Sequence, residues 1–265
     1  MPKQPATLII AIANQKGGVG KTTTAVNLGA CLAETGIDTV IVDLDPQGNA
    51  STGLGLSAEA RRSTTYDLLV GEETLADVTQ PTAIERLGIV PSTPDLSSAD
   101  LELARTADRT RLLHRKLRQA SRPQIVLIDC PPALGLLTVN ALVAAHSVLV
   151  PLQAEFYALE GLSQLLQTVK QVRQSANDGL RVNGVLMTMS DGRNNLAQQV
   201  EADARATLGD LVYKTIIPRN VRVSEAPSFG APVVHYDPNS KGSVAYRAFA
   251  SEFVSRLDLS MEPAT

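Results

Sequence analysis

The chain has 265 residues, of which 44% are hydrophobic and 3% aromatic, and its formal net charge at pH 7 is −3. This composition suffices to bury the core of one large domain, and it excludes attraction of nucleic acid through overall charge. Two cysteines and no tryptophan exclude a disulfide framework and a base-stacking platform for single strands. No apolar stretch approaches the roughly 20 residues that cross a bilayer, and residues 1–6 lack the parts of a signal peptide, so we expect a cytoplasmic protein.

The first predicted elements are a buried strand over Thr7–Ile12 and a helix from Thr22 to Glu34 that is closed by Gly36. Between them, residues 16–22 read Lys-Gly-Gly-Val-Gly-Lys-Thr, a glycine-rich loop whose backbone N–H groups can wrap around phosphate oxygens. The last two residues of this loop, a lysine and a threonine, complete the grip. The phosphates would lie at the N-terminus of the helix, where negative charge is favoured.

The loop departs from the ordinary P-loop spelling. Gln15 stands where a glycine is usual, and Lys16 adds a lysine that phosphate binding does not require. Because this second ammonium cannot easily reach the phosphates already held by the loop, it could reach those of a partner subunit. The competing dinucleotide fingerprint G-x-G-x-x-G fits Gly18 and Gly20 but has Thr23 in its third glycine position. A lysine followed by a hydroxyl instead suits a triphosphate with Mg²⁺.

The next predicted strand, over Thr39–Leu44, is followed at once by a second carboxylate, so that Asp43 and Asp45 are spaced by one residue. In phosphoryl transfer a carboxylate can orient the attacking water or take up its proton. Two alternatives stay open: an acidic loop that caps the next element, and, for Asp43, a ribose-binding acid of a dinucleotide fold. The lysine and threonine of the loop favour hydrolysis.

A later apolar run, Ile125–Ile128, ends in Asp129, which can hold Mg²⁺ directly or through water. Aspartates often end strands, so this assignment depends on the glycine-rich loop. Cys31, inside the first helix, and Cys130, just after the strand, are expected to be small apolar fillers.

The remaining strand-like runs are Leu87–Val90, Ser147–Pro151, Val182–Met189 and Leu211–Ile217. They alternate with helical stretches, which predicts a single α/β domain with a mostly parallel sheet flanked by helices. We expect this domain to cover residues 1–257 and a short C-terminal tail to cover 258–265. The stretches 48–57 and 71–80 are expected to be loops at the edge of the active site.

Two groups of basic residues are candidates for contact with nucleic acid. Seven basic residues between 105 and 122 crowd one predicted helix, and there a solvated outer face is expected because Leu112, Leu113 and Leu117 can bury the other side. The second group lies beyond strand ends, on the side where open α/β sheets bind ligands, and consists of Arg193, Arg219 and Arg222.

Five segments together resemble the ParA/Soj chromosome-partitioning ATPases, which are P-loop NTPases of the deviant Walker A type. The segments are residues 14–24, 43–49, 128–132, 157–161 and 217–222. The first is shared across the deviant Walker A superfamily. Asp-Pro-Gln-Gly-Asn at 45–49 and Pro-Arg-Asn-Val-Arg at 218–222 narrow the resemblance to this family, and it spans nearly the whole chain.

The resemblance implies ATP and Mg²⁺ as cofactors. It assigns hydrolysis to Lys16 and Asp45, and Mg²⁺ to Thr22 and Asp129. The residues it assigns to the nucleotide are Lys16, Gly17, Gly18, Gly20, Lys21, Thr22 and Thr23 on the phosphates, and Pro218 and Asn220 beside the adenine.

The resemblance also implies partners. ATP would close two subunits into a homodimer in which Lys16 of each contacts the nucleotide of the other. The dimer would bind double-stranded DNA without sequence preference through Arg193 and Arg222, as a nucleoid-associated protein in chromosome or plasmid segregation. A ParB/Spo0J-type partner would stimulate hydrolysis and so release the DNA.

Rival functions on the same fold are weaker. A membrane-recruited relative of the MinD type needs a basic amphipathic helix, whereas residues 257–265 are acidic and contain Pro263, so no membrane partner is expected. An iron protein of the nitrogenase type needs a cysteine cluster that Cys31 and Cys130 do not supply. A small-molecule ligase needs a substrate pocket, and no residue in the sequence indicates one. A scaffold that binds ATP without hydrolysing it is disfavoured by Asp45.

Overall fold

The computed structural model describes residues 7–103, 108–120, 122–155 and 158–260. A seven-stranded sheet in the order β3-β4-β2-β5-β1-β6-β7 forms its centre. Every pairing is parallel except the antiparallel pair of β3 with β4, which confirms the predicted sheet. The strands are β1 (Leu8–Ile12), β2 (Thr39–Asp43), β3 (Gln80–Pro81), β4 (Leu87–Val90), β5 (Ile125–Asp129), β6 (Ser147–Gln153) and β7 (Arg181–Thr188).

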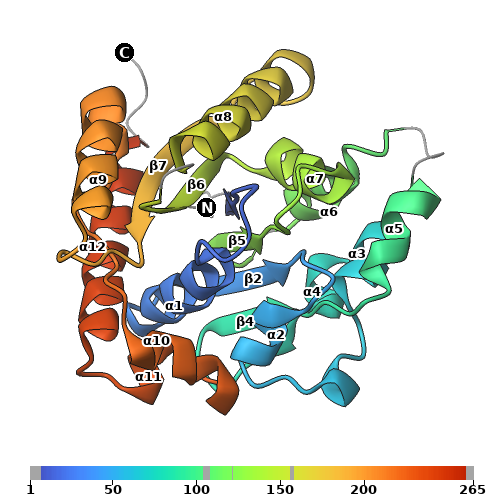
Figure 1. Ribbon diagram of the computed structural model, residues 1–265. Coiled ribbons are helices and arrows are strands. Elements are labelled where there is room, and N and C mark those ends of the chain that lie inside the picture. Colours follow the sequence, from blue (N-terminus) through green and yellow to red (C-terminus); the bar gives the residue numbers. More distant parts are fainter. Residues whose placement is uncertain (1–6, 104–107, 121, 156–157, 261–265) are drawn as a thin grey trace.

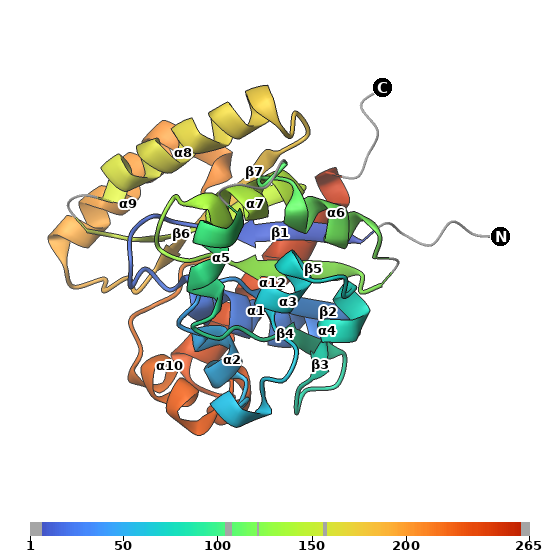
Figure 2. The same ribbon diagram turned by 90° about the vertical axis from the view of Figure 1, so that its right-hand side faces the viewer.

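Helices cover both faces of the sheet, and Figure 2 shows α8 and α10 at opposite ends of the molecule. The helices labelled in Figure 1 are α1 (Lys21–Glu34), α2 (Asn49–Gly53), α3 (Thr65–Val70), α4 (Leu75–Val78), α5 (Leu96–Leu103), α6 (Leu112–Arg118), α7 (Leu136–Ala144), α8 (Ala158–Ser175), α9 (Asn195–Leu208), α10 (Val221–Glu225), α11 (Val233–Tyr236) and α12 (Lys241–Ser260). Among the described residues, none of the helices is both long enough and apolar enough to cross a membrane.

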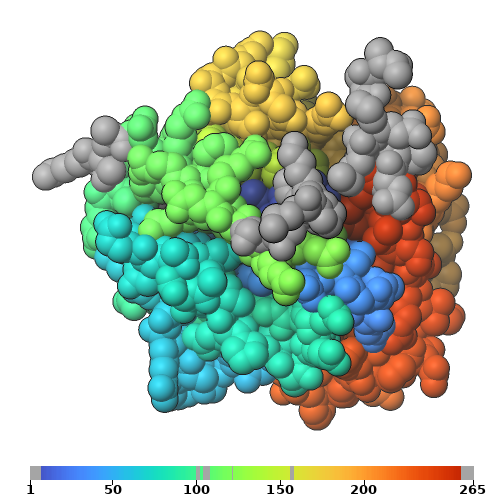
Figure 3. Space-filling model, turned by 180° about the vertical axis from the view of Figure 1, so that it is seen from behind, coloured from blue at the N-terminus to red at the C-terminus, as the bar shows by residue number. Residues whose placement is uncertain are grey.

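Alternate residues of each central strand enter two separate cores. In β1, Ile9 and Ala11 belong to the core shared with α3 to α9, whereas Ile10 and Ile12 belong to the core shared with α1, α2, α11 and α12. Because both faces are buried, the strand is apolar throughout. Figure 3, seen from behind, shows the cyan and green segments that carry α3 to α6 below the yellow α8.

The parallel register brings three strand ends to one edge of the sheet. Ile12 at the end of β1 lies beside Asp129 at the end of β5, and Asp129 lies beside Asp43 at the end of β2. In open α/β sheets ligands bind outside the carboxyl ends of the strands. The glycine-rich loop and the aspartates therefore meet at this edge.

The predicted strand over Leu211–Ile217 is wrong. Residues Gly209–Leu211 form a 3₁₀ turn, and the segment pairs with β7 and the loop after it through isolated bridges at Val212 and Pro218 instead of a continuous ladder. The reason is a long-range competitor: the carboxylate of Glu252 in α12 accepts the N–H groups of Lys214 at 2.8 Å and Thr215 at 2.9 Å. These donors are lost to a strand ladder.

The helix α12 also packs along α1. Arg247 of α12 donates to Glu34 at the end of α1 with an Nε to Oε2 distance of 3.1 Å. The hydroxyls of Tyr246 and Thr24, near the start of α1, lie 3.5 Å apart. One helix thus contacts both the helix that follows the glycine-rich loop and the segment held by Glu252.

The two stretches expected to be loops contain short helices. Residues 48–57 include α2, and residues 71–80 include α4, which begins with a reciprocal cap between Thr74 and Asp77. A threonine followed three residues later by an acid is the signal that was missed.

The basic helix is α6, which is shorter than expected, and its leucines Leu112, Leu113 and Leu117 are buried as predicted. Arg105 of that group, like residues 261–265 of the tail, lies outside the described residues. Cys31 and Cys130 are buried, which confirms their role as fillers. The division into a domain over 1–257 and a tail stays a prediction.

Replacing Gly184 in β7 with alanine should destabilise the fold by about 1–3 kcal/mol through overpacking. A Cβ there would lie 2.5 Å from Tyr213 Cε2 and 2.9 Å from the carbonyl oxygen of Leu211. Tyr213 is fully buried and held by the guanidinium of Arg256, 3.8 Å above its ring, so it has little room to move. Urea unfolding measures the effect. The matched control is Gly179→Ala, where the nearest atom is 3.7 Å from the new Cβ, and equal midpoints for the two variants would contradict the prediction.

Candidate functional site: a phosphate-binding loop and three aspartates

The glycine-rich loop is built on left-handed backbone. Gly18 has a φ of 75° and Gly20 a φ of 86°, conformations that favour glycine. Gly20 is the N-cap of α1 and has no side chain, and its carbonyl accepts the N–H of Thr24 at 2.9 Å. The N–H groups of residues 21–23 have no acceptor within the helix and can bind phosphate.

A pocket of about 460 Å³ opens over this loop. It is lined by Gly17, Gly18, Gly20, Lys21, Thr22, Thr23, Asp45, Gln47, Asn49, Thr52, Pro132, Met189 and Pro227. The structure thus brings together six of the residues assigned to phosphate with the candidate hydrolytic carboxylate. Their roles stay predictions.

The ammonium of Lys21 is buried and donates to the carbonyl oxygen of Lys16 at 3.0 Å. Burial lowers its pKa, and the negative charges of Asp129 and Asp45 oppose that shift. A cation in this position has lost much of its hydration, and among the described residues its hydrogen-bond partner is a backbone carbonyl. Phosphate oxygens would provide the charge partner that the loop itself lacks.

Lys16 has a different environment from Lys21. Its ammonium pairs with the carboxylate of Glu155, after β6, and it does not line the pocket. Its backbone N–H donates to Asn14 Oδ1 at 3.0 Å, which holds the start of the loop. The ammonium of the extra lysine is therefore paired with a carboxylate that, like Lys16, is not part of the pocket lining.

The two aspartates after β2 have separate environments. Asp43 Oδ2 accepts the N–H of Ser51 at 2.8 Å and its hydroxyl at 2.7 Å, so Asp43 holds α2 in place. Burial raises the pKa of Asp43 to about 6, which the hydrogen bonds from Ser51 counteract. Asp43 does not line the pocket, whereas Asp45 does, with its Oδ1 accepting the N–H of Gln47 at 3.0 Å. This placement favours Asp45 over Asp43 as the hydrolytic carboxylate.

Asp129 is the best-placed group for a metal. It is fully buried, and within the described part of the chain neither of its carboxylate oxygens has a hydrogen-bond partner. Burial and the charge of Asp43 raise its pKa well above the ordinary range, while Thr22 and Lys21 favour the ionised form. The Thr22 hydroxyl lies nearby without the geometry of a hydrogen bond.

These oxygens fit Mg²⁺, which prefers carboxylate, hydroxyl, phosphate and water ligands. Within the described ranges no cluster of three or more His, Cys, Asp or Glu side chains could hold a metal alone. Mg²⁺ would therefore need phosphate oxygens and water beside Thr22 and Asp129, as is usual for metals that arrive with a nucleotide.

Other predicted residues lie outside the pocket. Pro218 lines a neighbouring hollow, and Asn220 caps α10 by accepting the N–H of Arg222 at 2.9 Å. Arg193, in the turn after β7, and Arg222 are exposed. The adenine and DNA assignments of these residues stay predictions.

Six residues of the pocket wall have no site role in the sequence analysis: Gln47, Asn49, Thr52, Pro132, Met189 and Pro227. Of these, Met189 and Pro227 lie outside every segment that the sequence analysis connected with the site. Met189 has a φ of 51°, which is uncommon for a residue with a side chain. No sequence pattern indicates this conformation. Pro227 lies far along the chain from the glycine-rich loop, and no motif connects the two.

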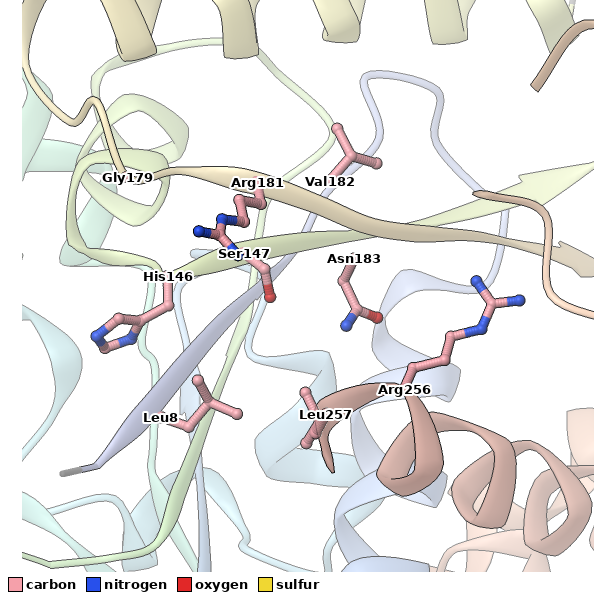
Figure 4. Close-up of a pocket in the computed structure, with 9 residues that line it drawn as sticks. All are labelled: Leu8, His146, Ser147, Gly179, Arg181, Val182, Asn183, Arg256 and Leu257. Atoms are coloured by element: carbon pink, nitrogen blue, oxygen red, sulfur yellow. The ribbon is translucent and has the colours of Figure 1, made fainter. Parts of the chain in front are cut away.

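A second pocket, of about 330 Å³, lies at the opposite edge of the sheet. Figure 4 shows Leu8, Ser147 and Arg181, the first residues of β1, β6 and β7, around it, with Arg256 of α12 on another side. It contains none of the predicted site residues. Because ligands of such sheets bind at the carboxyl ends of the strands, we assign the nucleotide to the pocket over the loop.

The parallel sheet, the left-handed glycines at the start of α1 and the buried aspartate at the end of β5 define a P-loop nucleotide-binding protein. A family model described as an AAA domain matches residues 7–182. The chain is 53% identical to the chromosome partitioning protein ParA of Caulobacter vibrioides, with 94% of each chain covered. It is 51% identical to the sporulation initiation inhibitor protein Soj of Bacillus subtilis, with 92% of this chain and 97% of that protein covered. The chain belongs to the ParA/Soj family of partitioning ATPases.

A solved relative has a different name on the same fold. The crystal structure titled cobyrinic acid a,c-diamide synthase from Mycobacterium smegmatis, with bound ADP and magnesium, superimposes with a TM-score of 0.83. It is 35% identical and covers 97% of both chains. The higher identity to proteins named ParA and Soj favours partitioning over synthesis of a small molecule.

Proposed function

We propose that this chain is a DNA-partitioning ATPase that hydrolyses ATP with Mg²⁺, dimerises when ATP is bound, and holds double-stranded DNA without sequence preference until hydrolysis. A ParB/Spo0J-type partner would stimulate that hydrolysis. The work would take place in the cytoplasm on the nucleoid, in segregation of a chromosome or plasmid.

One observation supports the proposed ATP-bound dimer. Lys16 lies in the phosphate loop, yet its ammonium pairs with Glu155 and stays out of the pocket. A cation that belongs to the phosphate loop but is not used in its own pocket is well placed to reach a triphosphate held by a second copy of the chain. The Lys16–Glu155 pair would have to open for that contact.

The cofactors follow from the pocket and from the solved relatives. Thr22 and Asp129 would hold Mg²⁺, which neutralises the charge that develops on the phosphates during transfer. Lys21 and the N–H groups at the start of α1 would bind the phosphates. Asp45 would orient the water that attacks the γ-phosphate.

The DNA contact rests on exposed arginines at the carboxyl edge of the sheet. Arg193 follows β7 and Arg222 lies in the first turn of α10. A dimer presents both residues twice, so its affinity for a phosphate backbone exceeds that of a single subunit.

Binding to a duplex in the presence of ATP, ADP or no nucleotide tests the function. We expect only the ATP sample to bind, and we expect Arg193→Ala combined with Arg222→Ala to abolish the gel shift while the protein still binds ATP. Fluorescence anisotropy with duplexes of unrelated sequence checks that sequence has little effect. Equal binding in all three nucleotide states, or a normal shift with the double variant, would contradict the proposal.

A further inference from the structure

The two arginines assigned to DNA are already paired with carboxylates. Arg193 makes two contacts to Asp191, from Nε to Oδ1 and from Nη2 to Oδ2, both at 3.0 Å. Arg222 contacts Glu225 at 2.9 Å and Asp237 at 3.2 Å. Three carboxylates thus offset the charge of two arginines, so this pair alone gives no positive surface.

Two further cations on the same surface have no such partner. Within the described part of the chain, neither Arg219 nor Lys241 lies within ion-pair distance of a carboxylate, and both are exposed. The charge of Arg219 is felt by Asp191, whose pKa is lowered to about 2, chiefly by the hydrogen bonds of Arg193 and to a smaller extent by Arg219. Arg219 therefore lies close to the Arg193 turn.

Backbone contacts hold the turn after β7, which carries Arg193, against the segment that carries Arg219. The N–H of Arg219 donates to the carbonyl oxygen of Ser190 at 2.9 Å, and the N–H of Ser190 donates to Ile217 at 3.1 Å. A hollow of about 470 Å³ is lined by residues of these two segments and of the start of α12, among them Gly192, Pro218 and Lys241.

The start of α12 also packs directly on α10. A Cβ on Gly242 would lie 2.3 Å from Val223 Cγ2, so the Val223 side chain packs against the backbone of Gly242. Lys241, the residue before Gly242, is thereby fixed beside the turn that carries Arg222.

We infer that Arg219 and Lys241 supply the net positive charge of this surface and bind phosphates of double-stranded DNA. With them, four cations face three carboxylates, which leaves one net positive charge on this surface of each subunit. This inference rests on the proposed function. It adds Arg219 and Lys241 to Arg193 and Arg222 as DNA contacts, because the charges of the latter two are already offset by carboxylates.

The test measures duplex affinity of the full chain with ATP over a range of salt concentrations, by fluorescence anisotropy. Each DNA-bound dimer would lose two phosphate contacts in Arg219→Ala or in Lys241→Ala. We expect the affinity to fall roughly tenfold and the slope of log affinity against log salt to fall by about 1.8. Lys241→Arg should restore the affinity.

Two controls separate charge from folding. Lys170→Ala removes an exposed lysine from α8, on another part of the molecule, and should leave both affinity and slope unchanged. Asp191→Asn removes a carboxylate from the surface and should raise the affinity, a gain that a damaged fold cannot produce. Urea unfolding midpoints confirm that each variant is folded.

The outcomes distinguish the inference from the function. If wild-type protein binds DNA only with ATP, and Arg219→Ala and Lys241→Ala bind as tightly as wild type, the inference is overturned and the function stands. If wild-type protein shows no ATP-dependent binding at all, the proposed function fails first. Loss of affinity without a change in salt slope would also overturn the inference, because it would indicate a contact that is not electrostatic.

Discussion

Replacing Lys16 with alanine is expected to abolish ATP-dependent dimerisation while a single subunit still binds ATP. Lys16 does not line the pocket of its own chain, so its loss leaves Lys21 and the loop amides in place. A hydrogen bond from a charged group contributes about 1.5–3 kcal/mol, and a symmetric dimer would lose two of them. The dimer dissociation constant should therefore rise about 100-fold or more. Light scattering with ATP measures the dimer, and titration with a fluorescent ATP analogue measures nucleotide binding.

The Glu155→Gln variant is the informative companion. It removes the charge that holds Lys16 in its own chain but keeps a side chain of the same shape. This variant should dimerise at least as readily as wild type, because Lys16 no longer has to leave an ion pair. An unchanged dimer in Lys16→Ala would refute the role of Lys16. So would a structure with an ATP analogue in which Lys16 contacts the nucleotide of its own subunit.

Replacing Asp45 with alanine is expected to lower the hydrolysis rate by about 100- to 10,000-fold, the range typical of general acid–base groups. Asp45 lines the pocket over the phosphate loop, whereas Asp43 is held by Ser51 outside it. The ATP-bound dimer should then persist on DNA. Release of inorganic phosphate measures turnover, and retention on immobilised duplex measures the trapped complex.

Asp45→Asn is the matched control for structure. The asparagine oxygen can still accept the N–H of Gln47, so the turn after β2 is kept while the charge is lost. Both variants should therefore be slow. If Asp45→Asn hydrolyses ATP at the wild-type rate, Asp45 does not act as a base or orient water through its charge. Normal phosphate release from Asp45→Ala would exclude any catalytic role.

The parts of the site that were predictable lie close together in sequence or at strand ends. The loop at residues 16–22 carries its own conformational signal in its glycines, because Gly18 and Gly20 need left-handed backbone. The aspartates Asp43 and Asp129 end buried apolar runs, and parallel strands bring their ends to one edge. Local pattern and the rules of sheet packing were enough to place them.

The parts that were not predictable depend on contacts between distant residues. The Leu211–Ile217 run has the composition of a strand, but Glu252 takes the N–H groups in its middle. Lys16, in the loop after β1, pairs with Glu155, which follows the neighbouring strand β6. No local sequence pattern at either residue predicts this ion pair. Pro227 reaches the pocket only because the segment between α10 and α11 folds back over α2.

The long last helix, α12, contacts two distant parts of the molecule. Near its start, Tyr246 approaches Thr24, one turn inside the helix that begins at the phosphates. Further along, Glu252 grips the stretch that leads into Pro218. The helix that begins at the phosphate loop and the segment that leads to Pro218 are thus both held by α12. Any displacement of α12 would therefore act on both segments together.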